Sequence, residues 1–204
     1  MPDNETENNL AGELSHPQKK PSVPVKYIGP LSRFEETDNN ESRRNKNHLL
    51  IILSGPEPQR TILENKVIND IVHYPASATV VRGLPGSANI IPSTNMIRFY
   101  NHLPAHELKK EMIAADYIIS RSGYSTIMDL TRFHKKSILI PTPGQTEQEY
   151  LAGHLMKNNI FYTADQKGLD IQQAIKEAAS FPFNIPGSDM EKYKEVVAQF
   201  VQSF

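Results

Sequence analysis

Residues 118–129 read Ile-Ile-Ser-Arg-Ser-Gly-Tyr-Ser-Thr-Ile-Met-Asp, and this stretch decides the fold. A short apolar run leads into a turn of small residues, and the turn opens an amphipathic helix. This arrangement points free backbone N–H groups and the positive end of the helix dipole at one place, where they can bind a phosphate. Asp129 would lie just beyond that phosphate, where a ribose diol would sit.

Two ordinary structural interpretations of the same stretch stay open. Thr126 and Asp129 have the spacing of a capping box, in which the threonine caps the helix and the carboxylate reaches back to it. Arg121 could form a structural ion pair with a carboxylate on some loop. In either case the stretch would stabilise the fold without binding a ligand.

Apolar runs alternate with amphipathic segments from residue 48 onward. The pattern predicts strands at 48–54, 78–82, 96–100, 117–120, 137–140 and 161–163, and helices at 59–72, 104–114, 124–134, 147–158, 168–179 and 189–204. Strands that alternate with helices are typical of βαβ units. The sequence therefore predicts an α/β fold, with a Rossmann-like parallel sheet flanked by helices.

The two ends of the chain differ from this pattern. Residues 1–47 are polar, and we expect them to form a linker or mobile tail with one short extended element at 25–31 and a charged loop at 35–47. We expect the Rossmann-like domain to span residues 48–182. A proline-containing break precedes the C-terminal helix predicted within residues 183–204.

Composition excludes several functional classes. The 204-residue chain has no cysteine, so a disulfide scaffold, thiolate catalysis and cysteine-based zinc sites are excluded. A net charge of −1 gives no general electrostatic reason to bind nucleic acid. No apolar run has the length of a membrane span, no signal peptide is evident, and the histidines do not follow a metal-binding pattern. We expect a cytoplasmic protein without a bound metal.

Small, polar and turn-forming residues follow the predicted strands. They are Ser54-Gly55-Pro56-Glu57, Arg82-Gly83, Asn101-His102, Arg121-Ser122-Gly123 and the segment from Pro141 to Gln145. Parallel sheets bind ligands beyond the carboxyl ends of their strands, so these residues predict a pocket for a polar, phosphate-bearing ligand. Neither the dinucleotide fingerprint nor the P-loop motif is present. Alone, Ser54-Gly55 could be a simple turn, and residues 145–149 an ordinary acidic helix start.

The order of three segments resembles the C-terminal, donor-nucleotide-binding domain of GT-B glycosyltransferases. The closest group is family 28, which includes the N-acetylglucosaminyltransferase of lipid II synthesis. Residues 53–56 match its glycine-rich turn, residues 115–129 match Ala-Asp-x-x-Ile-Ser-Arg-x-Gly-x-x-Thr-x-x-Glu, and residues 140–152 match its proline-rich turn and glutamine-containing loop. The resemblance covers residues 48 to about 165. Asp129 replaces the usual Glu, and Leu151 replaces the usual Asn.

The resemblance implies a set of ligand contacts. The nucleotide and diphosphate would be bound by Ser54, Gly55, Tyr100, Asn101, Arg121, Ser122, Gly123, Ser125, Thr126 and Asp129. Within this set, Asp129 would bind the ribose hydroxyls, and the turn at 99–103 would contact uracil. The donor sugar would contact Gln145, Glu147 and Gln148. No cofactor is required, the ligand is a UDP-sugar, and the sequence does not identify a catalytic residue.

The resemblance also implies the wider function. The chain would be the UDP-sugar-binding half of a GT-B glycosyltransferase that transfers a hexosyl or N-acetylhexosaminyl group to an acceptor hydroxyl. Its catalysis would need an acceptor domain, supplied by a missing N-terminal domain or by a partner protein. The full enzyme could associate peripherally with the inner membrane face. Two alternatives remain: a nucleotide-sugar epimerase-like domain, with Glu147 as its acid or base, and a non-catalytic subunit that docks an acceptor-domain partner.

Overall fold

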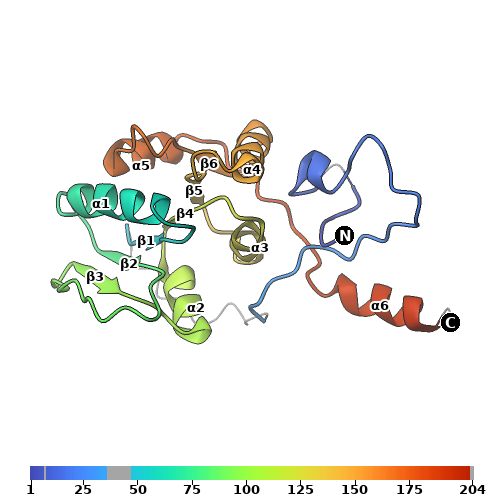
Figure 1. Cartoon of the computed structure of the whole chain (residues 1–204), viewed down its shortest axis with the longest axis horizontal. Helices are drawn as coiled ribbons and strands as arrows, with labels where there is room; N and C mark the ends of the chain where they lie inside the picture. The colour runs from blue at the N-terminus through green and yellow to red at the C-terminus, as the bar shows by residue number, and fades with distance from the viewer. Residues whose placement is uncertain (7, 36–46, 203–204) are drawn as a thin grey trace.

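A sheet of six parallel strands forms the centre of the computed structural model, which describes residues 1–6, 8–35 and 47–202 (Figure 1). The strands are β1 (Leu49–Ile52), β2 (Ala78–Val81), β3 (Ile97–Tyr100), β4 (Tyr117–Ser120), β5 (Ser137–Leu139) and β6 (Tyr162–Thr163). Their order in the sheet is β3-β2-β1-β4-β5-β6, and each neighbouring pair is parallel. The predicted Rossmann-like parallel sheet is confirmed.

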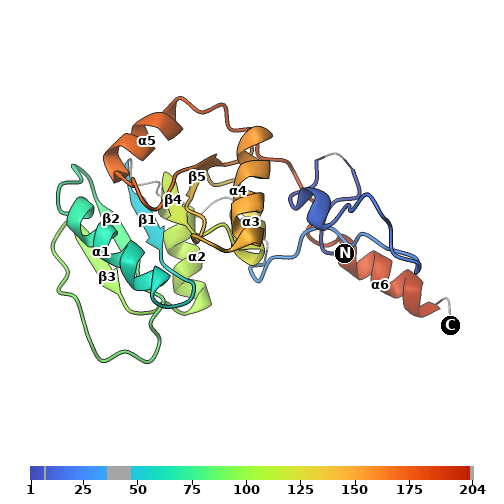
Figure 2. The ribbon, with the colours of Figure 1, turned by 45° about the horizontal axis from the view of Figure 1, so that its top comes forward.

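Helices cover both faces of this sheet (Figure 2). They are α1 (Gln59–Ile71), α2 (Ala105–Ala114), α3 (Tyr124–Arg132), α4 (Thr146–Lys157) and α5 (Ile171–Ala179). Successive side chains of a strand point to opposite faces, so Leu49 and Ile51 pack with α1 and α5, whereas Leu50 packs with α2, α3 and α4. Burial on both faces explains why β1 is apolar throughout.

The strand order reverses direction between β1 and β4. After β1 the chain adds β2 and β3 on one side, and it then crosses to place β4 on the other side of β1. The carboxyl ends of these two central strands flank a crevice where open α/β sheets bind their ligands. The fold therefore brings together the turns that follow residues 52 and 120.

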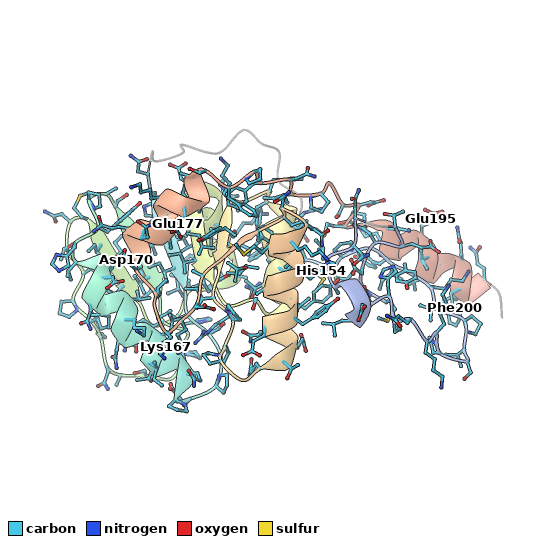
Figure 3. All side chains as sticks on the ribbon, turned by 90° about the horizontal axis from the view of Figure 1, so that it is seen from above. His154, Lys167, Asp170, Glu177, Glu195 and Phe200 are labelled. Carbon is cyan, nitrogen blue, oxygen red and sulfur yellow. The ribbon has the colours of Figure 1, made fainter. Side chains whose placement is uncertain are left out.

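Residues 1–6 and 8–16 are packed on the domain, in contrast to the mobile tail expected from their composition. The buried Asp3 carboxylate accepts hydrogen bonds from the backbone N–H groups of Leu10 at 2.8 Å and Ala11 at 2.9 Å. Leu10 is fully buried in the core beneath α3 and α4. A 3₁₀ helix, η1 (Gly12–Leu14), lies beside His154 of α4 (Figure 3). The burial of Leu10 and the hydrogen bonds of the Asp3 carboxylate thus hold an otherwise polar segment in place.

Residues 25–35 connect this segment to the domain without forming a strand, so the extended element predicted at 25–31 is irregular backbone. Phe34 is buried and its ring centroid lies 5.2 Å from that of Phe133, at the end of α3. The backbone N–H of Leu31 contacts the sulfur of Met128 at 3.1 Å. Residues 28–35 therefore form a strap across α3. Most of the predicted charged loop, residues 36–46, lies outside the described residues.

The last helix, α6 (Lys192–Gln202), projects from the domain beside the N-terminal segment (Figure 1). It contains no buried residue. The two segments meet where Asn4 Nδ2 donates to Ser188 Oγ at 3.1 Å. The C-terminal helix is where the sequence predicts it, although residues 203–204 lie outside the described part. Among the described residues, no helix is long and apolar enough to cross a membrane.

Replacing Gly12 by alanine is expected to detach η1 from α4. Gly12 has a φ of +54°, and an added Cβ would lie 2.4 Å from the Tyr150 hydroxyl oxygen. The combined strain is worth about 1–3 kcal/mol, which exceeds what one short segment can absorb. We expect faster hydrogen exchange at the amides of residues 10–15 in the alanine variant.

The matched control is Gly153→Ala, on the exposed side of α4. Nothing lies within 4 Å of the Cβ that this change adds, and alanine is the better helix former by about 1 kcal/mol. We expect Gly153→Ala to leave exchange at residues 10–15 unchanged. Equal protection of that segment in both variants would show that the packing of Gly12 does not hold η1 in place.

Candidate nucleotide-binding site

The predicted ligand-binding turns meet at the switch point of the sheet. Ser54 and Gly55 follow β1 and are exposed, and Gly123 follows β4 and is half-buried. Residues 52 and 120 pair directly between the two strands. The structure therefore brings the two most informative turns of the sequence to one place.

The amino terminus of α3 has no side-chain cap. Gly123 is the N-cap residue and no side chain accepts a hydrogen bond from the first turn. The first turn of α1 is different, because Thr61 N donates to the Glu57 carboxylate at 3.2 Å. The N-cap residue of α4 makes no side-chain cap, whereas α5 is capped by Asp170 (Figure 3), which accepts from Gln173 N at 2.9 Å. The capping-box interpretation of Thr126 and Asp129 is therefore wrong. The first turn of α3 keeps the N–H groups that an anion would use.

Asp129 is buried beneath the strap. Its carboxylate accepts a hydrogen bond from Ser32 Oγ at 2.8 Å and an ion pair from Arg33 Nε at 3.0 Å. Burial raises the pKa of Asp129, and the contacts with Ser32 and Arg33 oppose this shift. Because only 4% of Asp129 is exposed, a ribose could reach its carboxylate only by displacing Ser32 and Arg33. Sequence reasoning missed Ser32 and Arg33, because nothing in the pattern links them to Asp129, which lies 97 positions after Ser32.

Arg121 is buried without a carboxylate partner among the described residues. Its Nη2 donates to the carbonyl of Gln59 at 2.9 Å, and its Nη1 donates to the carbonyls of Ile140 and Pro141, both at 3.2 Å. Burial lowers the pKa of Arg121 to about 10, so the guanidinium stays charged at neutral pH. Among the described residues, Arg121 therefore forms no ion pair, and its partners are backbone carbonyls.

The loop between β5 and α4 is held by the side chain of Gln148. Its Oε1 accepts from Thr142 N at 3.0 Å, and its Nε2 donates to Gln145 Oε1 at 2.5 Å. Ser122 Oγ donates to the carbonyl of the same glutamine at 2.8 Å. Glu147 is exposed at the first turn of α4. Of the three predicted sugar-binding residues, Gln145 and Gln148 face each other and Glu147 points to solvent.

The loop after β2 is fixed by Asn101. Its Oδ1 accepts from Arg82 Nη1 at 2.6 Å, and its Nδ2 donates to the carbonyls of Ser87 at 2.8 Å and Asn89 at 3.0 Å. All the polar atoms of this side chain are used, so in the turn at 99–103 a base would have to bind to backbone groups, to the exposed His102 or to the half-buried rings of Phe99 and Tyr100. Arg82, which the sequence places among the strand-end residues, follows β2 at the same edge.

The family profile of the "Glycosyltransferase family 28 C-terminal domain" matches residues 95–201, just over half of the chain. The chain belongs to this family. The family 28 profile includes the β4–α3 junction and the β5–α4 loop, which carry most of the candidate site, and nearly all of α6. The resemblance inferred from the sequence is confirmed.

Two curated relatives match part of this family 28 domain. Both are UDP-N-acetylglucosamine--N-acetylmuramyl-(pentapeptide) pyrophosphoryl-undecaprenol N-acetylglucosamine transferases. The protein from Caldanaerobacter subterraneus subsp. tengcongensis is 35% identical over 71 residues, which are 34% of this chain and 20% of that protein. The protein from Methylobacterium sp. is 34% identical over 77 residues, which are 38% of this chain and 18% of that protein. The matches span only about a fifth of the relatives' length.

Solved structures share the fold of the family 28 domain. A kitacinnamycin glycotransferase superposes with a TM-score of 0.56 at 14% identity, covering 87% of this chain and 45% of that protein. MurG from Acinetobacter baumannii superposes with a TM-score of 0.51 at 13% identity, covering 89% of this chain and 57% of that protein. This chain therefore matches about half of a GT-B glycosyltransferase.

Proposed function

We propose that the chain is the donor-binding half of a glycosyltransferase and binds a UDP-sugar at the crevice between β1 and β4. The observation that carries this proposal is the uncapped amino terminus of α3 at the switch point of the sheet. Family membership adds that the domain belongs to a glycosyltransferase. The two curated relatives are named for a UDP-N-acetylglucosamine donor, which favours UDP as the nucleotide.

The proposed contacts follow from this placement. The diphosphate accepts hydrogen bonds from the first turn of α3, at Gly123, Ser125 and Thr126, and from the turn at Ser54-Gly55. Ribose hydroxyls donate to Asp129 after Ser32 or Arg33 releases it. Gln145, Glu147 and Gln148 lie where the sugar extends from the β-phosphate. UDP leaves when the acceptor hydroxyl attacks the anomeric carbon, and the helix terminus stabilises the charge that develops on the diphosphate without a protein-bound metal.

Catalysis by this domain needs a second domain that binds the acceptor. The side of the molecule formed by α6 and the N-terminal segment is suited to contact it, because Val197 is 50% and Val201 64% exposed there. A half-open pocket of about 340 Å³ lies between Tyr27 of the N-terminal segment and Val196 of α6. We propose that residues 48–182 form the donor-binding unit. Residues 1–47 and 183–204 would then face the acceptor domain, whether it belongs to the same polypeptide or to a partner subunit.

Titration calorimetry with UDP tests the proposal directly. We expect the chain to bind UDP at submillimolar concentration, and to bind uridine much more weakly because uridine lacks the diphosphate. A chain that shows no heat of binding with millimolar UDP would contradict the proposed function. Family membership favours a transferase over the epimerase-like alternative, and no contact of Glu147 points to an acid or base role.

A further inference from the structure

The buried side chain of Arg121 connects three segments at the carboxyl edge of the sheet, and Gln59 connects them to a fourth. Arg121 belongs to the β4–α3 loop, and its guanidinium donates to Gln59 at the start of α1 and to Ile140 and Pro141 after β5. Gln59 Oε1 accepts from Gln166 Nε2, in the β6–α5 loop, at 2.7 Å. We call these residues (Gln59, Arg121, Ile140, Pro141 and Gln166) the Arg121 cluster.

The turn at Gly55 lies directly against the Arg121 cluster. A Cβ added at Gly55 would be in van der Waals contact with Arg121 Nε, at 3.9 Å, and with Thr142 Oγ1, at 3.6 Å. Neither of these buried atoms has a hydrogen-bond partner among the described residues. The Ser54-Gly55 turn therefore lies close to Arg121 on one side and to the β5–α4 loop on the other.

The three carbonyl oxygens that Arg121 contacts need an arginine as their hydrogen-bond donor. The planar guanidinium donates in several fixed directions, and here it reaches carbonyls on two different loops, which a single ammonium could not reproduce. Arg121 is only 1% exposed, so it is not placed to touch a ligand itself. Its effect on a ligand must therefore act through the loops.

We infer that Arg121 is a positioning residue that sets the β1–α1 and β5–α4 loops around the diphosphate and sugar of the donor. This inference rests on the proposed function and deepens it. The base is proposed to bind at residues 99–103, which make no hydrogen bond with the Arg121 cluster. Loss of the cluster is therefore expected to weaken binding of UDP but not of uridine.

The experiment compares Arg121→Met with Lys135→Met. Lys135 is the matched control because it is also buried and its Nζ donates to two backbone carbonyls, Ile113 at 2.5 Å and Ala115 at 2.9 Å. These carbonyls precede β4, at the opposite edge of the sheet from the site. Both variants are expected to lower the midpoint of thermal unfolding. Only Arg121→Met is expected to raise the Kd for UDP, by about tenfold, while the weak uridine binding seen by NMR titration is unchanged.

Two further variants keep the inference testable if Arg121→Met does not fold. Arg121→Lys keeps the charge but loses the set of carbonyl contacts, so its UDP binding should stay weak; full recovery would overturn the positioning role in favour of charge alone. Gln166→Ala removes one outer contact of the cluster and should weaken UDP binding by less than Arg121→Lys does. Equal UDP affinities of Arg121→Met and Lys135→Met would also overturn the inference, as would a parallel loss of uridine binding. Failure of the unaltered chain to bind UDP would instead contradict the proposed function.

Discussion

Replacing Gly83 by alanine is expected to destabilise the domain by about 3 kcal/mol, from a positive-φ strain of about 1 kcal/mol and a backbone clash of about 2 kcal/mol. Gly83 follows β2 with a φ of +71°, and an added Cβ would lie 2.4 Å from the carbonyl oxygen of Leu53. That oxygen belongs to the backbone at the end of β1, so no side-chain rotation can make room. Either β1 and β2 separate at their carboxyl ends or the alanine stays in a conformation that L residues avoid.

Gly86→Ala is the control for this change, because it adds the same methyl group to the same loop. Nothing lies within 4 Å of the Cβ that it adds, and its φ lies outside the left-handed region. We expect its free energy of unfolding in urea to stay within about 0.5 kcal/mol of the unaltered chain. If the two variants unfold at the same urea concentration, the close approach of Gly83 to Leu53 does not contribute to stability.

The pattern of apolar residues along the chain was enough to predict the sheet, because the apolar residues of each strand indicate which of its faces are buried. Residues 49–52 are apolar at every position since both faces of β1 are covered, and β4 begins and ends where the pattern placed it. For the other elements, the observed ends differ from the predicted ends by up to three residues. Helix α5, for example, begins at Ile171 after its Asp170 cap, instead of at residue 168.

Contacts between segments that are far apart in the sequence produce no such pattern of apolar residues. Leu10 and Leu14 both lie in a polar segment, and only the fold shows that Leu10 fills the core beside α4 whereas Leu14 is exposed. Arg121 was expected to pair with a carboxylate or a ligand, but its partners are backbone carbonyls, which every residue carries and no sequence pattern marks. The sequence could place the site at one edge of the sheet, but it could not tell which side chains remain available to a ligand.

Asp129→Ala is expected to weaken UDP binding by roughly 100-fold, or about 3 kcal/mol, if the carboxylate accepts hydrogen bonds from both ribose hydroxyls. In the unliganded chain the same carboxylate holds Ser32 and Arg33, so the variant also frees the strap from α3. The cost to stability should be small, because the Arg33 side chain is 56% exposed and water replaces its partner. Calorimetry with UDP on a variant that unfolds at nearly the same temperature separates the two effects.

A second ligand identifies the ribose contact itself. The 2′-deoxy analogue of UDP lacks one hydroxyl, so the unaltered chain should bind it about tenfold more weakly than UDP. In Asp129→Ala the two ligands should bind equally, because the acceptor for that hydroxyl is gone. Glu195→Ala, which removes an exposed carboxylate on α6, should keep the full discrimination. If Asp129→Ala still distinguishes the two ligands, the ribose is bound by another group, and Asp129 serves only to hold the strap on α3.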